Sequence, residues 1–247
     1  MPYPVVDAHR LIGPIPFDDL PEDPRPDMAR LGIGRAYVTH SLSLHSDARA
    51  GNEALLALDD PRLVPVPVLL PDPPGPRWSG AGPTGAGWSG AGPTGAGPFG
   101  CEAGRDVPMV RLCPARHRFD LTGPSALRAL AALGVPAALD LDETTPAQLL
   151  ALARELPGQR VLLLNPGYRR LRAIAELMAA LPNLWLEIGT VNTQRGVEWL
   201  ARRFGAERLV FGTGAPVMDD CGPRFLLDHL DLPEADIALI ASGGGLL

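Results

Sequence analysis

Lysine is absent from the sequence, and all 22 of its basic residues are arginine. Catalysis by a Schiff-base or pyridoxal-phosphate lysine is therefore excluded, as are phosphate binding by a Walker lysine and metal bridging by a carbamylated lysine. These exclusions remove two large classes of enzyme, the lysine-dependent aldolases and the lysine-bridged dinuclear hydrolases.

Cysteines, long apolar runs and clustered basic residues are also scarce. The three cysteines are odd in number and lack CxxC spacing, which indicates a reducing compartment. The longest apolar run, residues 63–70, is too short to span a bilayer, and residues 1–4 show no feature of a signal peptide. The net charge is −6 without a basic block, so no nucleic-acid partner is expected. We therefore expect a cytoplasmic protein without membrane segments.

Short apolar runs recur along the chain, and each is followed by a turn or by a helix-like segment. We predict eight buried strands, at residues 4–9, 36–40, 63–69, 109–112, 136–141, 160–164, 184–188 and 209–211. Helices are predicted at residues 146–156, 169–181 and 195–204, where apolar residues recur at helical spacing. Nearly continuous apolar strands that alternate with helices are typical of a parallel sheet covered on both faces.

Eight such units in 247 residues favour a single domain, residues 1–247, with an α/β fold of the (β/α)8 TIM-barrel type. The alternative is an open, doubly wound sheet. No GxGxxG motif follows the first predicted strand, which counts against a dinucleotide-binding sheet.

Residues 71–106 are expected to form a low-complexity loop, inserted into the barrel domain in place of its third helix. The segment is rich in glycine and proline, and the decapeptide WSGAGPTGAG occurs at residues 78–87 and again at 88–97. Such a composition disfavours a helix and buries little apolar surface. Two interpretations remain: Trp78 and Trp88 belong to a mobile lid over the barrel mouth, or the repeat is a tolerated expansion.

Three groups of motifs stand at the ends of predicted strands. The sequence VDAHRL occupies residues 6–11, LLNPG occupies residues 163–167, and the C-terminal part contains PN at 182–183, RFG at 203–205 and FGTGAP at 211–216. Together they resemble the amidohydrolase-related family of metal-dependent hydrolases, over nearly the whole chain except residues 71–106. The resemblance implies a TIM barrel that hydrolyses or decarboxylates a small, carboxylate-bearing molecule.

Most of the metal ligands that the resemblance implies are replaced. His9 matches the first histidine of the family, but Leu11 stands where the second is expected. Asn165 occupies the place of another histidine, and Gly214 that of the catalytic aspartate of the last strand. Catalytic zinc normally has three protein ligands, and leucine and glycine supply none. We therefore expect no cofactor; zinc or manganese is implied by the resemblance alone.

Polar residues at other strand ends offer a substitute site. Asp7 and His9 face the barrel axis if the family register holds, and Glu187 closes the seventh predicted strand. We predict that His9 and Asp7 transfer protons, with Glu187 in the same site. A relocated metal site would use His9, His40 and Asp140. The alternative is that the carboxylates pair with arginines and that His9 is a hydrogen-bonded core histidine.

Basic residues cluster after the fourth predicted strand. Arg111 lies at the end of that strand, and Arg116 and His117 lie in the loop that follows. Arginine forks bind carboxylate or phosphate groups through paired hydrogen bonds. We predict that these residues bind a small anion, with Asn165 and Tyr168 as neutral hydrogen-bonding groups. The alternative is that the arginines neutralise nearby acids.

The sequence therefore predicts an amidohydrolase-related hydrolase or decarboxylase of a small anionic molecule. An inactive barrel that binds a small anion or a protein is the competing hypothesis, favoured by the missing metal ligands. A nucleophilic Cys113 activated by His117 is a further alternative. A homo-oligomer is compatible with the sequence.

Overall fold

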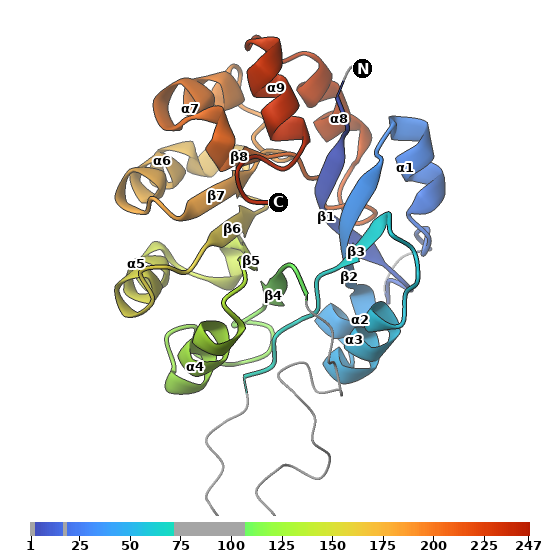
Figure 1. The fold of residues 1–247 in the computed structure, drawn as a ribbon, viewed down its shortest axis with the longest axis vertical. Helices are drawn as coiled ribbons and strands as arrows, with labels where there is room; N and C mark the ends of the chain where they lie inside the picture. The colour runs from blue at the N-terminus through green and yellow to red at the C-terminus, as the bar shows by residue number, and fades with distance from the viewer. Residues whose placement is uncertain (1–2, 17–18, 72–106) are drawn as a thin grey trace, which may run out of the picture.

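A computed structural model describes residues 3–16, 19–71 and 107–247. These ranges contain eight parallel strands (Figure 1). The strands follow one another at spacings that the sequence predicts. They are β1 (Val6–Ile12), β2 (Arg35–His40), β3 (Leu63–Pro65), β4 (Val110–Leu112), β5 (Ala137–Asp140), β6 (Val161–Leu164), β7 (Leu184–Glu187) and β8 (Leu209–Val210).

The strands pair in chain order. One sheet has the order β1-β2-β3 and the other β4-β5-β6-β7-β8, and every pair is parallel. Isolated parallel bridges join the sheets at both edges, from Val68 to Arg111 and from Arg10 to Ala215. Near the second bridge the amide of Ala8 donates to the carbonyl of Phe211, at 2.9 Å. The predicted α/β fold of eight strands is thereby confirmed, with each carboxyl end directed to a common rim, here called the mouth.

Helices lie outside the strands (Figure 1). They are α1 (Arg25–Leu31), α2 (Ser41–His45), α3 (Ala48–Leu56), α4 (Pro124–Leu133), α5 (Pro146–Glu155), α6 (Leu171–Ala180), α7 (Gly196–Phe204), α8 (Cys221–Asp228) and α9 (Glu234–Ala241). The three predicted helices are present as α5, α6 and α7. Helix α5 begins where expected because Thr145 and Gln148 form a capping box and Pro146 occupies the first turn.

Helix α6 buries the apolar residues that recur at helical spacing in its sequence. Its buried residues are Ile174, Ala175, Leu177 and Met178, which form one apolar stripe against the strands. The main hydrophobic cluster lies between helices and strands, while a second cluster includes Ala8 of β1, Tyr37 of β2, Leu162 of β6 and Met109, which precedes β4. Side chains alternate between these two clusters because successive residues of a strand point to opposite faces.

Six strands match their predicted bounds to within one residue at each end, and β3 and β1 differ by more. Strand β3 ends at Pro65 rather than at residue 69, because Pro65 and Pro67 have no N–H to donate to a neighbouring strand. Strand β1 runs to Ile12 rather than residue 9. The predicted loop at 71–106 falls, beyond residue 71, outside the described residues, and so do Trp78 and Trp88. Among the helices that are described, none is long and apolar enough to cross a membrane.

Candidate functional site

Five polar side chains, each on a different strand or on the residue that follows it, form one hydrogen-bonded network at the mouth. Arg111 of β4 donates to Asp140 at the end of β5, and the side-chain amide of Asn165, after β6, donates to the other carboxylate oxygen of Asp140. The backbone amide of Asn165 donates to Oε2 of Glu187 on β7 at 2.9 Å, and Nδ1 of His9 on β1 lies 3.4 Å from the same oxygen. All five were predicted as site residues, although the sequence did not predict these pairings.

The imidazole of His9 has a defined tautomer in this network. Glu187 is fully buried and accepts hydrogen bonds from the amides of Asn165 and Gly189. A carboxylate that accepts several hydrogen bonds offers only lone pairs, so the His9 nitrogen that faces it carries the proton. In the neutral form of the imidazole the proton therefore sits on Nδ1, and Nε2 keeps a lone pair that can accept a proton.

Arg111 and Asp140 form an ion pair with little access to solvent. Burial acts to raise the pKa of Asp140, but the charges of Arg111 and His9 and the hydrogen bonds from Asn165 and Arg111 outweigh it and hold that pKa at about 2. The pKa of Arg111 is raised: burial, the largest single effect, acts to lower it, but Asp140, Cys113 and Glu187 together outweigh burial. The pair is therefore charged at neutral pH.

This ion pair predicts an acid-sensitive contribution to stability. The pKa of Asp140 is about 2, against an ordinary value of 3.8. A lowered carboxylate pKa stabilises the fold above about pH 4, and the stabilisation is lost as the pH falls toward about 2. The expected loss is about 2 kcal/mol of unfolding free energy. In urea unfolding, the wild type should lose more stability across this range than Asp140→Asn, which keeps the shape without the titration; equal losses would contradict the prediction.

Asn165 has a backbone conformation that few residues adopt. Its φ of 46° is in the left-handed region, which asparagine tolerates better than most residues. Its Nδ2 faces Asp140, so the amide orientation is fixed and Oδ1 is buried without a hydrogen-bond partner among the described residues. A Cβ on Gly214 would lie 3.4 Å from this oxygen. Two positions that the resemblance assigned to ligands are therefore neighbours in space.

Asp7 lies close to the network but has a different set of partners. Its carboxylate accepts from the backbone amides of His9 and Thr213, each at 3.0 Å, and from the Thr213 hydroxyl at 2.7 Å. Arg10 lies 3.5 Å from the same carboxylate. Burial raises the pKa of Asp7 despite the charge of Arg10 and these hydrogen bonds. Asp7 therefore fixes β1 against the segment after β8 and positions His9.

A β-bulge explains why Asp7 departs from the expected alternation. The pairing of β1 with β2 shifts between Asp7 and Arg10, so that these two residues lie opposite Ala36 and Val38. Both of those partners pack in the main cluster, on the helix side of the sheet. A single inserted residue reverses the side-chain alternation that follows it. The expectation that Asp7 and His9 share a face depends on unbroken alternation, which the bulge interrupts. The carboxylate of Asp7 therefore contacts Arg10 and Thr213.

Arg10 was not selected from the sequence, yet it is almost completely buried. Its guanidinium pairs with Asp7 and, at 3.3 Å, with Asp220 in the loop before α8. Arg30 of α1 reaches Asp220 from the other side, at 3.2 Å. The signal in the sequence was an arginine within an otherwise apolar strand, since a buried arginine requires carboxylate partners.

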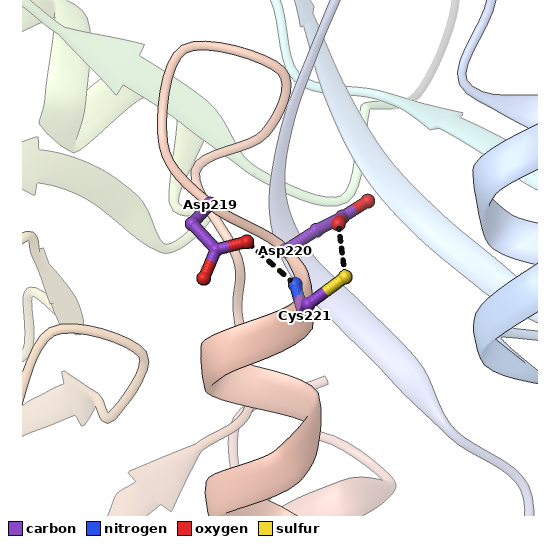
Figure 2. Close-up of side chains that lie close together, drawn as sticks. All are labelled: Asp219, Asp220 and Cys221. Atoms are coloured by element: carbon purple, nitrogen blue, oxygen red, sulfur yellow. Dashed lines mark hydrogen bonds between the residues drawn. The ribbon is translucent and has the colours of Figure 1, made fainter.

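Asp219, Asp220 and Cys221 form the one trio of potential metal-ligand atoms found among the described residues (Figure 2). Asp219 accepts from the backbone amides of Cys221 and Gly222 at the start of α8. Asp220 is held by the Arg10 and Arg30 ion pairs. These residues therefore cap a helix and join β1 to α1.

The predicted basic cluster is divided between two places. Arg111 enters the network, whereas Arg116 pairs with Glu143 at 3.3 Å and remains partly exposed. Burial lowers the pKa of His117, and its Nδ1 has no hydrogen-bond partner in the part of the chain that the structure describes. Tyr168 is exposed on the rim, where its hydroxyl accepts from Arg169. Burial raises the pKa of Cys113 to about 12, so its thiol is protonated at neutral pH and a poor nucleophile.

His40 lies away from His9. It ends β2 opposite Ile12, which packs on the helix side of the sheet. Its Nδ1 accepts from the amide of Leu42, and its ring packs against Gly13. It lines a cavity of about 350 Å³ that also includes Glu22 and Asp23. His9, His40 and Asp140 are therefore not brought together as one metal site among the described residues.

The donor set at the mouth does not fit the metal site that the resemblance implies. Leu11 packs in an apolar cluster with Leu44, Val68 and Cys113. Gly214 has no side chain, and the space beside it is occupied by Met218, since an added Cβ would lie 3.0 Å from Met218 Cγ. Catalytic zinc requires about three protein ligands, and these positions do not provide them.

Fold and site together define an eight-stranded parallel α/β protein with a polar site at the carboxyl ends of its strands. The family model described as amidohydrolase matches residues 8–243. The chain therefore belongs to the amidohydrolase family. No curated protein matches the chain in sequence.

Several solved structures have the same fold. An uncharacterized TIM-barrel protein from Bordetella bronchiseptica is 16% identical, with 96% of this chain and 94% of that chain covered and a TM-score of 0.65. 5-Carboxyvanillate decarboxylase from Sphingomonas paucimobilis is 10% identical, with 98% of each chain covered and a TM-score of 0.64. The enzyme of that name from Novosphingobium aromaticivorans, complexed with manganese and 4-hydroxy-3-methoxy-5-nitrobenzoic acid, is 13% identical over 96% and 93% of the chains, with a TM-score of 0.63.

Proposed function

We propose that this protein hydrolyses or decarboxylates a small, carboxylate-bearing molecule at the mouth, with His9 as the proton-transfer residue. The observation that carries the proposal is the buried pair of His9 and Glu187, which lies in one network with the Arg111–Asp140 ion pair. A histidine oriented by a carboxylate is a common general acid–base device.

In a decarboxylation, the C–C bond to the carboxylate breaks, carbon dioxide leaves, and the electron pair stays on the carbon. That carbon then takes a proton from His9 Nε2, in the imidazolium form. In a hydrolysis, Nε2 accepts a proton from the attacking water and returns it to the leaving group. Glu187 stabilises the imidazolium in both cases, because the charge develops next to its carboxylate.

Binding of the carboxylate falls to Arg111 in this proposal. Its side chain is directed into the network, and its buried Nε has no hydrogen-bond partner among the described residues. Arg116, His117 and Tyr168 remain a second, outer group that contacts the more distant part of the ligand. Asn165 supplies a buried carbonyl oxygen, which favours a ligand that also carries a hydroxyl or amine donor.

The comparisons support the reaction class. Two of the solved structures are decarboxylases whose named substrate is 5-carboxyvanillate, and one was determined with a substituted benzoic acid and manganese. The same fold is therefore used for aromatic carboxylates. At 10–13% identity, the substrate of this chain is a separate question.

The proposal is tested with a panel of benzoates that carry ring hydroxyl or carboxyl groups and a panel of carboxylate-bearing esters and amides. We expect the purified protein either to release carbon dioxide from one of the benzoates or to hydrolyse one of the esters or amides, with saturation kinetics. The Arg116→Gln variant should raise KM by less than Arg111→Gln, because the Arg116 side chain is 42% exposed and its charge is screened by water, whereas Arg111 is buried. Absence of turnover on both panels would contradict the enzyme assignment.

A binding protein is the second candidate function. It is favoured by Leu11 and Gly214, which supply no metal ligand in the family's positions. In that case the Arg111 site still binds a carboxylate, and turnover stays at the uncatalysed rate while calorimetry detects binding.

A further inference from the structure

We infer that this site works without a metal ion, and that the guanidinium of Arg111, held by Asp140, is its fixed cation. The inference rests on the proposed function for the nature of the ligand, a carboxylate. Its metal-free part stands on the structure alone, which supplies three independent observations.

The first observation concerns the positions where family ligands are missing. Leu11 is buried and packs with Val68 and Cys113 in an apolar cluster, so the Leu11 position supplies no donor atom. At Gly214 the space that a side chain would occupy is bounded by Met218 and by Oδ1 of Asn165. A thioether is a poor ligand for zinc or manganese, and a single amide oxygen supplies at most one of the several ligands that either ion needs. Both positions are built as apolar or neutral surface.

The second observation is that most of the remaining donors, including both oxygens of Asp140, are already used within the protein. His9 Nδ1 faces Glu187, and both oxygens of Asp140 accept hydrogen bonds, one from Arg111 and the other from Asn165. In the described ranges, no three ligand atoms of this network come as close together as a metal site requires. Among the described hydrogen bonds, only two potential ligand atoms of this network, His9 Nε2 and Asn165 Oδ1, are left without a partner. This is fewer than the three protein ligands of a catalytic metal, so a metal would have to displace the other hydrogen bonds to gain a third ligand.

The third observation is the charge itself. Arg111 is 4% exposed and interacts electrostatically with both Asp140 and Glu187. A divalent cation placed beside those carboxylates would be repelled by the guanidinium. Arg111 already provides the positive charge that a metal would supply, and its guanidinium is suited to binding a carboxylate. The buried Nε of Arg111 has no partner among the described residues, so the protein does not use the full hydrogen-bonding capacity of this guanidinium.

The metal-free part is tested on the full-length wild type, grown with added manganese and zinc and analysed by elemental mass spectrometry after dialysis. We expect less than about a tenth of an ion per chain, and no change in Tm with added Mn²⁺. A bound ion that disappears in His9→Gln would overturn the inference. An ion that is retained in His9→Gln lies elsewhere, for example at Asp219 and Asp220, and this result would agree with the inference.

The role of Arg111 is tested by calorimetric binding of benzoate in the presence of EDTA. We expect the wild type to bind, Arg111→Gln to lose at least about tenfold in affinity, and Arg111→Lys to recover part of it because the charge returns without the fork. Exposed Arg172 on α6 provides a matched control, and Arg172→Gln should bind as the wild type does. Circular dichroism establishes that each variant is folded.

The outcomes separate the inference from the proposed function. Wild-type affinity in Arg111→Gln would overturn the role of Arg111, whether or not turnover is found. Loss of benzoate binding in EDTA, restored by Mn²⁺, would overturn the metal-free site while leaving the hydrolase or decarboxylase assignment intact. If no turnover is detected but benzoate binding still depends on Arg111, the proposed enzymatic activity is wrong and the metal-free carboxylate site is supported.

Discussion

The His9→Gln variant is expected to lose at least about 100-fold in kcat, because general acid–base catalysis contributes about 10²–10⁴-fold. Glutamine keeps the size and polarity of the side chain but cannot take up a proton at neutral pH. His9 is nearly buried, and its ring contacts Glu187 through Nδ1 alone among the described hydrogen bonds. The substitution therefore removes the proton-transfer group and little of the packing. Steady-state kinetics on the substrate identified from the panels measures the effect.

Two further variants distinguish proton transfer from structural damage. Glu187→Gln should lower kcat by less than His9→Gln and shift the pH dependence of kcat, because the imidazolium loses its neighbouring carboxylate. His229→Gln is the matched control, because this exposed histidine follows α8 and its ring contacts Phe225 rather than a residue of the network. A His9→Gln enzyme with wild-type kcat would exclude His9 as the proton-transfer residue.

The arrangement of strands and helices could be predicted from the sequence because it depends on repeated local patterns. Apolar runs mark the strands, and the stripe of Ile174, Leu177 and Met178 marks α6. The strand-end rule also predicted the members of the network. His9, Asp140 and Glu187 come from strands far apart in sequence, yet parallel strands bring their carboxyl ends to one rim.

The partners of these residues could not be predicted, because they depend on single-residue events in the backbone. The bulge in β1 turns Asp7 toward Arg10 and Thr213, and no residue pattern in VDAHRL indicates a bulge. The ring of His40 packs against Gly13, which depends on the path of the loop after β1. The left-handed conformation of Asn165 directs its backbone amide to Glu187 and its side chain to Asp140. Local propensity is too weak to specify such features.

The pairing of arginines with acids depends on the same geometry. The sequence left open whether Arg111 and Arg116 bind a ligand or neutralise nearby acids, and the structure pairs them with Asp140 and Glu143. The two pairs differ in burial: Arg111 is enclosed, whereas the Arg116 side chain is 42% exposed. Water screens the second pair strongly and the first weakly. Only the first pair therefore offers a strong fixed charge to a ligand.

The Phe211→Ala variant is expected to lose about 3–5 kcal/mol of unfolding free energy, the usual cost of emptying a fully buried aromatic site. Phe211 follows β8 and has no exposed surface. Its carbonyl accepts from Ala8 of β1 and its amide donates to Ile240 of α9, so its ring packs where the first strand, the last strand and the last helix meet. For a chain of this size the loss corresponds to a decrease in Tm of about 6–20 °C.

Phe225→Ala is the matched control, because it removes the same side chain from the surface of α8. Phe225 is 64% exposed and stacks on His229, so its loss should cost less than about 1 kcal/mol. Urea unfolding of both variants gives the comparison. Similar losses in the two variants would mean that the junction between β1 and β8 is not tightly packed. A large loss confined to Phe211→Ala would show that stability depends on this junction, which also holds His9 and Thr213 in register.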